Sequence, residues 1–334
     1  MFVKPDTMKA LVLEHAGEDF ALTEMSVPVP EPKEGQLLIK VEYAALNPVD
    51  TKLALSGHSQ WQYPHIPVLD GVGKVVASGD EHSPIFGERV IWHSDLTKQG
   101  VLAEYAVIDA HAVAVVPDEI ASADAATIPC AGMTAALSIC TLSAQAGDKI
   151  LIEAGAGAVG QFAIQLAKIN NLTVYTTASK QHHNFLKTLG ADFVFDYKSD
   201  NLVDDIRETL GHERLDKVLD SIGGDVTVRD IELLKFNGSI ACLNSLPELD
   251  PDLMFTKAPS IHVISLGGAW LSNDMCAQHK LGLKGSCLLE LVTKKQLKLP
   301  DVIEIPFESQ EVTSAMHRQL AGGLFGKQVV KIAS

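Results

Sequence analysis

Three glycines spaced as G-x-G-x-x-G follow a short apolar run at residues 150–152 and precede a segment, residues 161–168, with apolar side chains at helical spacing. This order predicts a buried strand, a tight turn and a helix. Gly155 would permit the turn, Gly157 would let the backbone approach a pyrophosphate, and Gly160 would let the helix pack closely on the strand. Phosphates would bind the unpaired N–H groups at the helix start, where the helix dipole favours negative charge. The candidate ligands are Gly155, Ala156, Gly157, Ala158, Val159 and Gly160.

The segments after this motif alternate between two kinds of pattern. Strand-like runs occupy residues 172–177, 193–196, 217–222 and 239–243, and amphipathic stretches occupy residues 184–189, 202–210 and 226–236. A glycine-rich turn can also join a strand to a helix without binding any ligand, so the motif alone is weak evidence. Strands that alternate with helices of this length predict a doubly wound parallel sheet, and in that context the motif indicates dinucleotide binding.

The residues expected at the end of the second strand bear on which dinucleotide binds. A classical NAD site has an Asp or Glu there, which hydrogen-bonds the ribose 2′-OH. This chain has Thr-Ala-Ser-Lys at residues 177–180, with no carboxylate to repel a 2′-phosphate. Ser179 can donate a hydrogen bond and Lys180 carries a positive charge, which favours NADPH. The alternative is that Ser179 caps the next helix and Lys180 is merely solvated.

Length and composition limit the class of protein. With 334 residues, the chain exceeds the usual size of one hydrophobic core, and 46% apolar and 21% charged residues are typical of a folded globular protein. A net charge of −15 argues against nucleic acid as a partner. Five scattered cysteines without a C-x-x-C pair support neither a disulfide framework nor a four-cysteine zinc site. The sequence shows no apolar signal core and no run of membrane-spanning length, so we expect a cytoplasmic protein without a membrane partner.

The residues on either side of the dinucleotide-binding region have a different character. From residue 9 to residue 130 short strand-like runs, at 10–13, 36–43, 73–77, 89–92 and 102–108, are broken by turn residues. This spacing predicts a compact and mostly antiparallel β domain, followed by a helical stretch over residues 124–142. After residue 243 we expect a strand at 261–266, a helical region at 275–295 and a closing strand at 326–331 that returns to the first domain.

Several segments, in order and at matching spacing, resemble the zinc-independent quinone oxidoreductase branch of the medium-chain dehydrogenase/reductase superfamily. They are residues 44–52, 67–73, 86–90, 102–105, 131–135, the glycine motif, 189–192, 220–224 and 326–327. The resemblance implies an α/β fold with a GroES-like β domain (8–130), an inserted Rossmann NADP-binding domain (131–270), and a helical segment with return strands (271–334) that completes the β domain.

The resemblance also implies functional residues. It places Asn47 and Thr134 near the nicotinamide, and Asp50 and Lys52 in the adjoining cleft, which makes these four the candidate catalytic residues. Further cofactor-binding candidates are Tyr197, Leu243, Asn244 and Lys327. The alternatives are a turn at Asn47, a surface ion pair between Asp50 and Lys52, and a helix cap by Thr134. One departure is His183, which stands where the family often has a second basic residue.

The same comparison argues against a catalytic zinc ion. At the places where zinc alcohol dehydrogenases of the superfamily carry their ligands, this chain has Asn47, Leu69 and Cys130, of which only the thiol is a good ligand. Histidines such as His93 show no convincing ligand spacing. Without a Lewis acid, the hydride acceptor should itself spread negative charge, as a quinone or an α,β-unsaturated carbonyl compound does. Aromatic candidates for the substrate pocket are Trp61, Tyr63, Trp92 and Trp270, with His93 beside them.

The sequence therefore predicts an NADPH-dependent reductase of quinones or activated alkenes. Two other functions stay open: an enoyl-thioester reductase, and a catalytically silent protein that binds nucleotide or RNA. No proton donor can be named from the residues alone. By family resemblance we also expect a homodimer that extends the sheet across two chains through the strand at residues 261–266.

Overall fold

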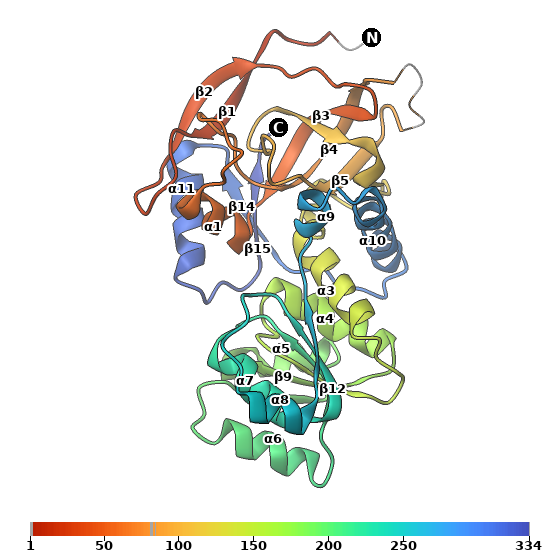
Figure 1. Cartoon of the computed structure of the whole chain (residues 1–334). Helices are drawn as coiled ribbons and strands as arrows, with labels where there is room; N and C mark the ends of the chain where they lie inside the picture. The colour runs from red at the N-terminus through yellow and green to blue at the C-terminus, as the bar shows by residue number, and fades with distance from the viewer. Residues whose placement is uncertain (1–2, 81–82, 84, 334) are drawn as a thin grey trace. The chain divides into compact units, whose positions relative to one another are not determined.

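The computed structural model describes residues 3–80, 83 and 85–333, which form two units (Figure 1). The first unit consists of residues 1–133 and 266–334, and the second of residues 134–265. The domain boundaries expected after residues 130 and 270 fall inside the helices α3 (Pro129–Thr141) and α9 (Gly268–Leu271). A change in sequence character thus lies close to each division of the structure.

The first unit is built on a seven-stranded sheet and a separate two-stranded sheet. The larger sheet has the order β14-β15-β3-β4-β5-β7, with β6 also paired to β3, and the smaller sheet pairs β1 with β2. The strands are β1 (Thr7–Leu13), β2 (Leu22–Pro28), β3 (Gln36–Ala45), β4 (Asp70–Ser78), β5 (Arg89–His93), β6 (Tyr105–Asp109), β7 (Val113–Val115), β14 (Val302–Pro306) and β15 (Lys327–Lys331). Every pair but β14–β15 is antiparallel, which confirms the expected GroES-like β domain.

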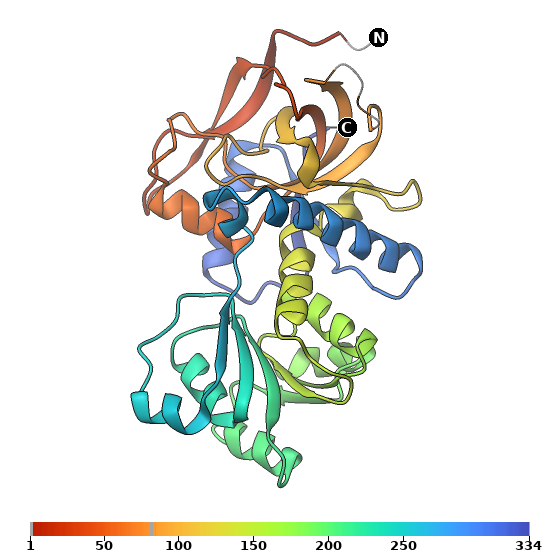
Figure 2. The same ribbon diagram turned by 45° about the vertical axis from the view of Figure 1, so that its right-hand side comes forward.

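Several helices pack around these sheets. They are α1 (Pro48–Ser56), the short 3-10 helix η1 (Ala110–Ala112), α2 (Ser122–Ala125), the first turn of α3, α9, α10 (Met275–Thr293) and α11 (Ser309–Leu320). The long helix α10 packs against β5 and β7, and Figure 2 shows its full length. Residues from β1, β3, β4 and α11 share one apolar core beneath them.

The structure corrects three expectations for the first unit. The helical stretch expected at residues 124–142 is two helices, because the ring of Pro129 cannot continue a helix from its preceding turn and begins α3 instead. Asn47 starts the helix α1 rather than an isolated turn, since Pro48 occupies the first helical position, where its missing N–H costs nothing. The return strands expected within residues 271–334 are β14 and β15, and they are joined by the helix α11, which the sequence analysis did not anticipate.

The second unit contains a six-stranded sheet in the order β10-β9-β8-β11-β12-β13, and all its strand pairs are parallel. Its strands are β8 (Lys149–Ile152), β9 (Thr173–Ala178), β10 (Phe193–Asp196), β11 (Leu215–Asp220), β12 (Leu234–Cys242) and β13 (Ser260–Val263). Its helices are α4 (Ala158–Ile169), η2 (Lys180–His182), α5 (His183–Thr188), α6 (Leu202–Leu210), α7 (Asp225–Leu233) and α8 (Pro251–Lys257), besides the rest of α3.

These elements form a doubly wound sheet, as the sequence predicted. The helices α7 and α8 pack against β12 and against each other on one face, and α4 covers β8 and β9 on the other (Figure 1). Several boundaries differ from the expectation, and the strand expected at residues 261–266 is β13, which ends at Val263. The helix expected at residues 226–236 ends at Leu233, because β12 begins at Leu234, and β11 ends at Asp220 rather than at residue 222.

Candidate active site

The glycine-rich loop of the second unit joins β8 to α4. No side chain caps the N-terminus of α4, whose N-cap residue is Gly157. A Cβ atom at Gly155 would lie 2.1 Å from Thr176 Oγ1, and one at Gly160 would lie 2.5 Å from the Ala154 carbonyl oxygen. A Cβ at Gly157 would meet only that carbonyl, at 3.3 Å. The protein's own packing thus requires glycine at 155 and 160, whereas at 157 the side chain is missing from the face that a ligand would approach.

The turn itself is made differently from the expectation. The left-handed residue is Ala154, with φ 53°, rather than Gly155. Two hydrogen bonds from β9 hold this strained backbone: the Ala154 N–H donates to Thr177 Oγ1 at 3.2 Å and the Gly155 N–H donates to the Thr177 carbonyl at 2.9 Å. Gln161 Nε2 donates to the Ala156 carbonyl at 2.8 Å. The loop is therefore fixed by protein contacts before any ligand binds.

Ser179 and Lys180 follow directly after β9. Ser179 is the N-cap residue of η2, but its side chain makes no capping hydrogen bond. Lys180 is exposed, and its Nζ lies 3.8 Å from Oδ2 of Asp196 at the end of β10. Asp196 and Ala178 are partners in the parallel register, which is why a carboxylate reaches this place although none occurs near residue 180 in the sequence. Sequence reasoning missed Asp196.

Two more predicted cofactor residues lie at the carboxyl edge of this sheet. The Leu243 N–H donates to the Asp220 carbonyl at 2.9 Å, and Asn244 Nδ2 donates to the Ser221 carbonyl at 2.8 Å, so the segment after β12 is tied to the segment after β11. Tyr197, just beyond β10, is exposed. Ligands of doubly wound sheets bind at this edge, outside the carboxyl ends of the strands.

Thr134 lies inside α3, where Ser138 Oγ donates to its carbonyl at 2.8 Å, so it does not cap that helix. It is half-buried and belongs to the second unit. The remaining predicted catalytic residues belong to the first unit.

In the first unit, Asp50 is buried at the start of α1. Its Oδ2 accepts the Asn47 N–H at 2.7 Å and its Oδ1 accepts the Leu69 N–H at 3.1 Å. A surface ion pair with Lys52 is therefore the wrong interpretation, because Asp50 is 1% exposed while Lys52 lies on the exposed side of the helix. The structure buries Asp50 and joins it to Asn47.

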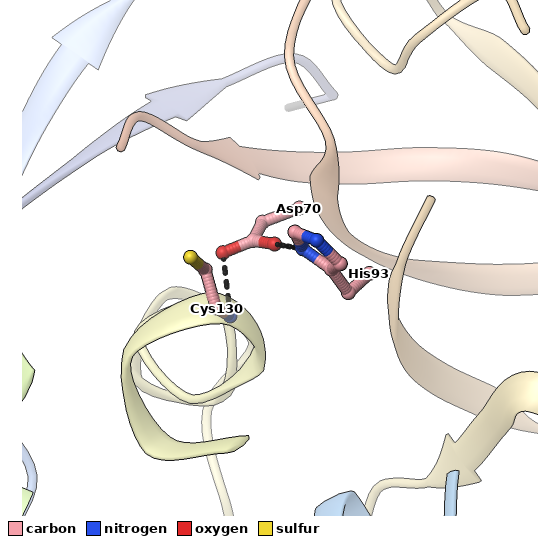
Figure 3. A group of neighbouring side chains, drawn as sticks. All are labelled: Asp70, His93 and Cys130. Atoms are coloured by element: carbon pink, nitrogen blue, oxygen red, sulfur yellow. Dashed lines mark hydrogen bonds and ion pairs between the residues drawn. The ribbon is translucent and has the colours of Figure 1, made fainter. Parts of the chain in front are cut away.

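A buried polar network extends from Asn47. Its Oδ1 accepts a hydrogen bond from Lys327 Nζ, and its Nδ2 donates to Asp70 Oδ2 at 2.8 Å. Figure 3 shows the far side of the network, where Asp70 Oδ1 lies 2.7 Å from His93 Nδ1 and Asp70 Oδ2 accepts the Cys130 N–H at 2.8 Å. The structure thus brings together Asn47, Asp50 and Lys327, which were predicted, and adds Asp70 as a second carboxylate partner of Asn47.

Burial controls the charge of this network. Burial, together with the neighbouring Asp70 carboxylate, raises the pKa of Asp50 to about 7, against the opposing effects of the Asn47 N–H and of Lys327. Asp50 therefore changes charge near neutral pH, in contact with the residue predicted to lie closest to the reaction.

Asp70, His93 and Cys130 each offer a possible metal ligand, and the three ligand atoms lie within 4.8 Å of one another (Figure 3). Their hydrogen bonds do not suit a metal, however. One oxygen of Asp70 faces His93, the other accepts two N–H groups, and the Lys327 ammonium is bound in the same network. A divalent ion would have to displace these bonds and would be repelled by the ammonium. The hydrogen bonds and the ammonium thus argue against a zinc ion at this place.

The aromatic candidates have structural partners. Trp61 stacks on His65 with ring centroids 3.7 Å apart and donates from Nε1 to the Leu96 carbonyl. Trp92 is fully buried in the core of the first unit, under Gly71. The ring of Trp270 is also buried, and within the described residues its Nε1 has no hydrogen-bond partner. A cavity of about 310 Å³ in the same unit is lined by residues of β1, β2 and β6 and by none of the predicted site residues.

No helix in the described part of the chain is long and apolar enough to span a bilayer. The cytoplasmic location stays a prediction from the sequence.

Comparisons with known proteins agree with both units. Residues 33–118 match the family model described as the alcohol dehydrogenase GroES-like domain, and residues 158–280 match the zinc-binding dehydrogenase model. Together with the fold, these matches define a medium-chain dehydrogenase/reductase.

Individual relatives narrow this class. A quinone oxidoreductase from Sus scrofa is 31% identical over 262 residues, which cover 76% of this chain and 79% of that protein. A chloroplastic quinone-oxidoreductase homologue from Spinacia oleracea is 36% identical, over 55% of this chain and 59% of its own length. A chloroplastic NADPH-dependent alkenal/one oxidoreductase from Arabidopsis thaliana is 34% identical, over 72% of this chain and 63% of its own length. The solved structure of a quinone oxidoreductase from Coxiella burnetii, 28% identical, aligns with a TM-score of 0.80 over 98% of this chain and 100% of that chain. The chain belongs to the quinone oxidoreductase branch of the superfamily.

Proposed function

We propose that the protein is an NADPH-dependent oxidoreductase that reduces quinones or α,β-unsaturated carbonyl compounds by hydride transfer without a metal ion. The observation that carries the proposal is the buried network in which Asp70 holds the Asn47 amide and that amide's oxygen in turn accepts from the Lys327 ammonium. A buried ammonium held in this way stabilises negative charge on an oxygen without a Lewis acid. A hydride acceptor that delocalises its negative charge needs no metal ion for this stabilisation.

The second unit supports the cofactor part of the proposal. The uncapped start of α4 and the open space beside Gly157 suit a pyrophosphate, and when bound the reduced nicotinamide would supply the hydride. The chain's own residues would bind the cofactor and the acceptor, orient them for hydride transfer, and exclude water. We propose that Asn47, Asp50, Lys52 and Thr134 serve the reacting groups, and that Ser179, Lys180, Tyr197, Leu243, Asn244 and Lys327 serve the cofactor together with the glycine-rich loop.

The test is oxidation of NADPH with a panel of quinones, enones, enals and enoyl thioesters, with simple alcohols and NADP⁺ as the contrasting assay. We expect turnover with quinones or enones that a metal chelator does not lower. Preference for an enoyl thioester would reassign the substrate class. Tight NADPH binding without turnover would point to a silent nucleotide-binding protein, and chelator-sensitive alcohol oxidation would refute the metal-free chemistry.

The choice between NADPH and NADH should depend on two charges. We expect Lys180→Ala to lower the NADPH/NADH ratio of kcat/KM about tenfold, because a charged hydrogen bond to phosphate contributes roughly 1.5 kcal/mol. Asp196→Asn should raise the ratio about threefold, because it frees Lys180 and removes a charge that repels the phosphate. Steady-state kinetics with both cofactors measure the two ratios.

Lys187→Ala on α5 is the matched control, since it removes an exposed positive charge from the helix that follows η2. Its ratio should stay within about a factor of two of wild type, as expected for an exposed charge away from the phosphate. If Lys180→Ala behaves like this control, Lys180 does not bind the 2′-phosphate.

We also propose a homodimer formed through β13. This strand is an edge of the six-stranded sheet, and Val263 at its end is 64% exposed. An unprotected apolar edge strand can pair with a second copy. Light scattering that gives the mass of one chain at micromolar concentration would contradict this proposal.

A further inference from the structure

A cluster of buried acidic groups lies directly beneath the glycine-rich loop, and the roles assigned above do not use it. Glu153 connects β8 to the loop, Asp220 ends β11, and Asp230 lies on α7; they are 2%, 0% and 0% exposed. Arg229 is the cation that contacts the cluster. Three carboxylates around one guanidinium leave negative charge that burial makes costly.

Glu153 is fully hydrogen-bonded, and its partners lead to the loop. Its Oε2 accepts a hydrogen bond from Thr177 Oγ1 at 2.5 Å, and its Oε1 accepts one from Arg229 Nη2. The same Thr177 hydroxyl oxygen accepts the N–H of Ala154, the left-handed residue of the turn. Burial raises the pKa of Glu153, against the opposing effects of Arg229 and of the Thr177 hydroxyl. Because Glu153 accepts the Thr177 hydroxyl proton, it fixes the direction of that hydroxyl, which leaves a lone pair for the loop backbone.

Asp220 is also satisfied. Its Oδ1 accepts the N–H groups of Ile222 and Gly223 at 2.8 and 2.9 Å, and its Oδ2 accepts Thr227 Oγ1 at 2.5 Å. An ionised carboxylate is the natural acceptor of three donors.

Asp230 differs from the other two. Its Oδ1 accepts both Nε and Nη2 of Arg229, at 2.9 and 2.7 Å, while its Oδ2 is buried without a hydrogen-bond partner among the described residues. Burial and the negative charge of Glu153 raise the pKa of Asp230 well above its ordinary value of 3.8, against the attraction of Arg229. Asp220 adds to the repulsion, and the Cys242 thiol of β12, whose own pKa burial raises to about 12, stays neutral.

We propose that Glu153 and Arg229 are positioning residues for the dinucleotide-binding loop, and that Asp230 takes part as a neutral carboxylic acid that holds Arg229 against Glu153. The inference rests on the proposed function, because it names what sets the loop that binds the cofactor. Arg229 reaches Glu153 with the same Nη2 atom that contacts Asp230. An uncharged Asp230 orients that nitrogen atom by hydrogen bonding but does not compete with Glu153 for the positive charge of Arg229.

Three variants of the full chain test the proposal. In Asp230→Asn the amide reproduces the neutral acid, with its oxygen toward Arg229 and its NH₂ in place of the unpartnered oxygen. In Glu153→Gln the amide NH₂ would compete with the Ala154 N–H for the Thr177 oxygen. Glu232→Gln, on the exposed side of the same helix α7, is the matched control for loss of one negative charge.

We expect Asp230→Asn and Glu232→Gln to bind NADPH within about twofold of wild type, and Glu153→Gln to raise the Kd and KM for NADPH at least about tenfold with little change in kcat. A loss of kcat at unchanged KM in Glu153→Gln would overturn the positioning role. Weakening by Asp230→Asn equal to that by Glu153→Gln would show that Asp230 is ionised, and would overturn its role as a neutral acid.

The pH dependence of stability separates this inference from the proposed function, because it needs no cofactor. A carboxyl group whose pKa is raised by folding stabilises the protein fully at low pH, and that contribution is lost as pH rises from about 4 through the folded-state pKa. The urea midpoint of Asp230→Asn should therefore fall less between pH 4 and pH 8 than that of wild type or Glu232→Gln. An unchanged slope would refute the neutral acid. Absence of nucleotide binding by wild type would instead refute the proposed function and, with it, the positioning role.

Discussion

Gly157→Ala is expected to leave the free energy of unfolding within about 1 kcal/mol of wild type and to weaken NADPH binding at least about tenfold. The backbone of Gly157 has φ −70° and ψ 161°, which alanine adopts readily, and its Cβ would meet only the Ala154 carbonyl, at 3.3 Å. Lower chain entropy in the unfolded state offsets the poorer N-cap. The added methyl group would occupy the space that the pyrophosphate needs. Urea denaturation and fluorescence titration with NADPH measure the two effects.

Gly160→Ala is the contrasting variant in the same loop. Its Cβ would lie 2.5 Å from the Ala154 carbonyl and 2.6 Å from Gly155 Cα, both backbone atoms that cannot move alone. Overpacking of this kind costs about 1–3 kcal/mol, so this variant should lose stability as well as NADPH affinity. If Gly157→Ala binds NADPH as wild type does, the loop does not hold the pyrophosphate, and the cofactor assignment fails.

The sequence predicted the part of the protein that depends on local pattern. The alternation of strands and helices after residue 150 gave the parallel sheet, because each buried strand is a short apolar run and each helix repeats its apolar residues on one face. The pattern of short strand-like runs divided by turn residues likewise predicted the antiparallel sheet of the first unit. Boundaries were less accurate where two elements adjoin without a turn residue, as at Leu233 and Leu234.

The residues that sequence reasoning missed depend on pairing between distant segments. Asp70 and His93 meet because β4 and β5 pair in antiparallel register, and Asp196 reaches Lys180 through the parallel register of β9 and β10. Arg229 and Glu153 are 76 residues apart. Neighbouring residues of an extended segment also point to opposite sides. The family comparison places Leu69 at a zinc-ligand position, whereas the residue that enters the network is its neighbour Asp70.

Asn47 and Lys327 show how far a resemblance can carry a site prediction. Both were named from the family pattern, and the structure joins them by a hydrogen bond between residues 280 positions apart. Their anchor was not named, although an Asp follows Leu69 directly, because a carboxylate on a strand is ordinarily solvated. Only the burial of Asp70, which is 0% exposed, shows that its charge must be balanced by neighbouring donors.

Substitution of Asp70 should have the largest effect in the first unit. Asp70→Ala would remove the side-chain partner of the Cys130 N–H and of His93 Nδ1, and would leave Asn47 Nδ2 only the Ala45 carbonyl, at 3.2 Å. Breaking a buried charged network typically costs about 3–5 kcal/mol, and we expect this loss in the free energy of unfolding. We further expect kcat/KM with an enone to fall at least about a hundredfold, because the Asn47 amide that binds Lys327 loses its charged acceptor; each factor of ten corresponds to about 1.4 kcal/mol.

Asp70→Asn separates hydrogen bonding from charge. Its amide oxygen can accept from Asn47 and Cys130, and its NH₂ can donate to His93 Nδ1 once the imidazole carries its proton on Nε2, so about 1–2 kcal/mol should be lost. Removing the Asp70 charge also removes a cause of the raised pKa of Asp50, which should fall below about 7. Protonated Asp50 stabilises the folded protein, and this stabilisation is lost as pH rises through the folded-state pKa of Asp50. In Asp70→Asn the loss should therefore be complete at a lower pH than in wild type. The contrary outcome is that Asp70→Ala and Asp70→Asn lower stability and kcat/KM equally, and that zinc is present in wild type but missing from both variants. That outcome would identify Asp70 as a metal ligand and refute the metal-free site.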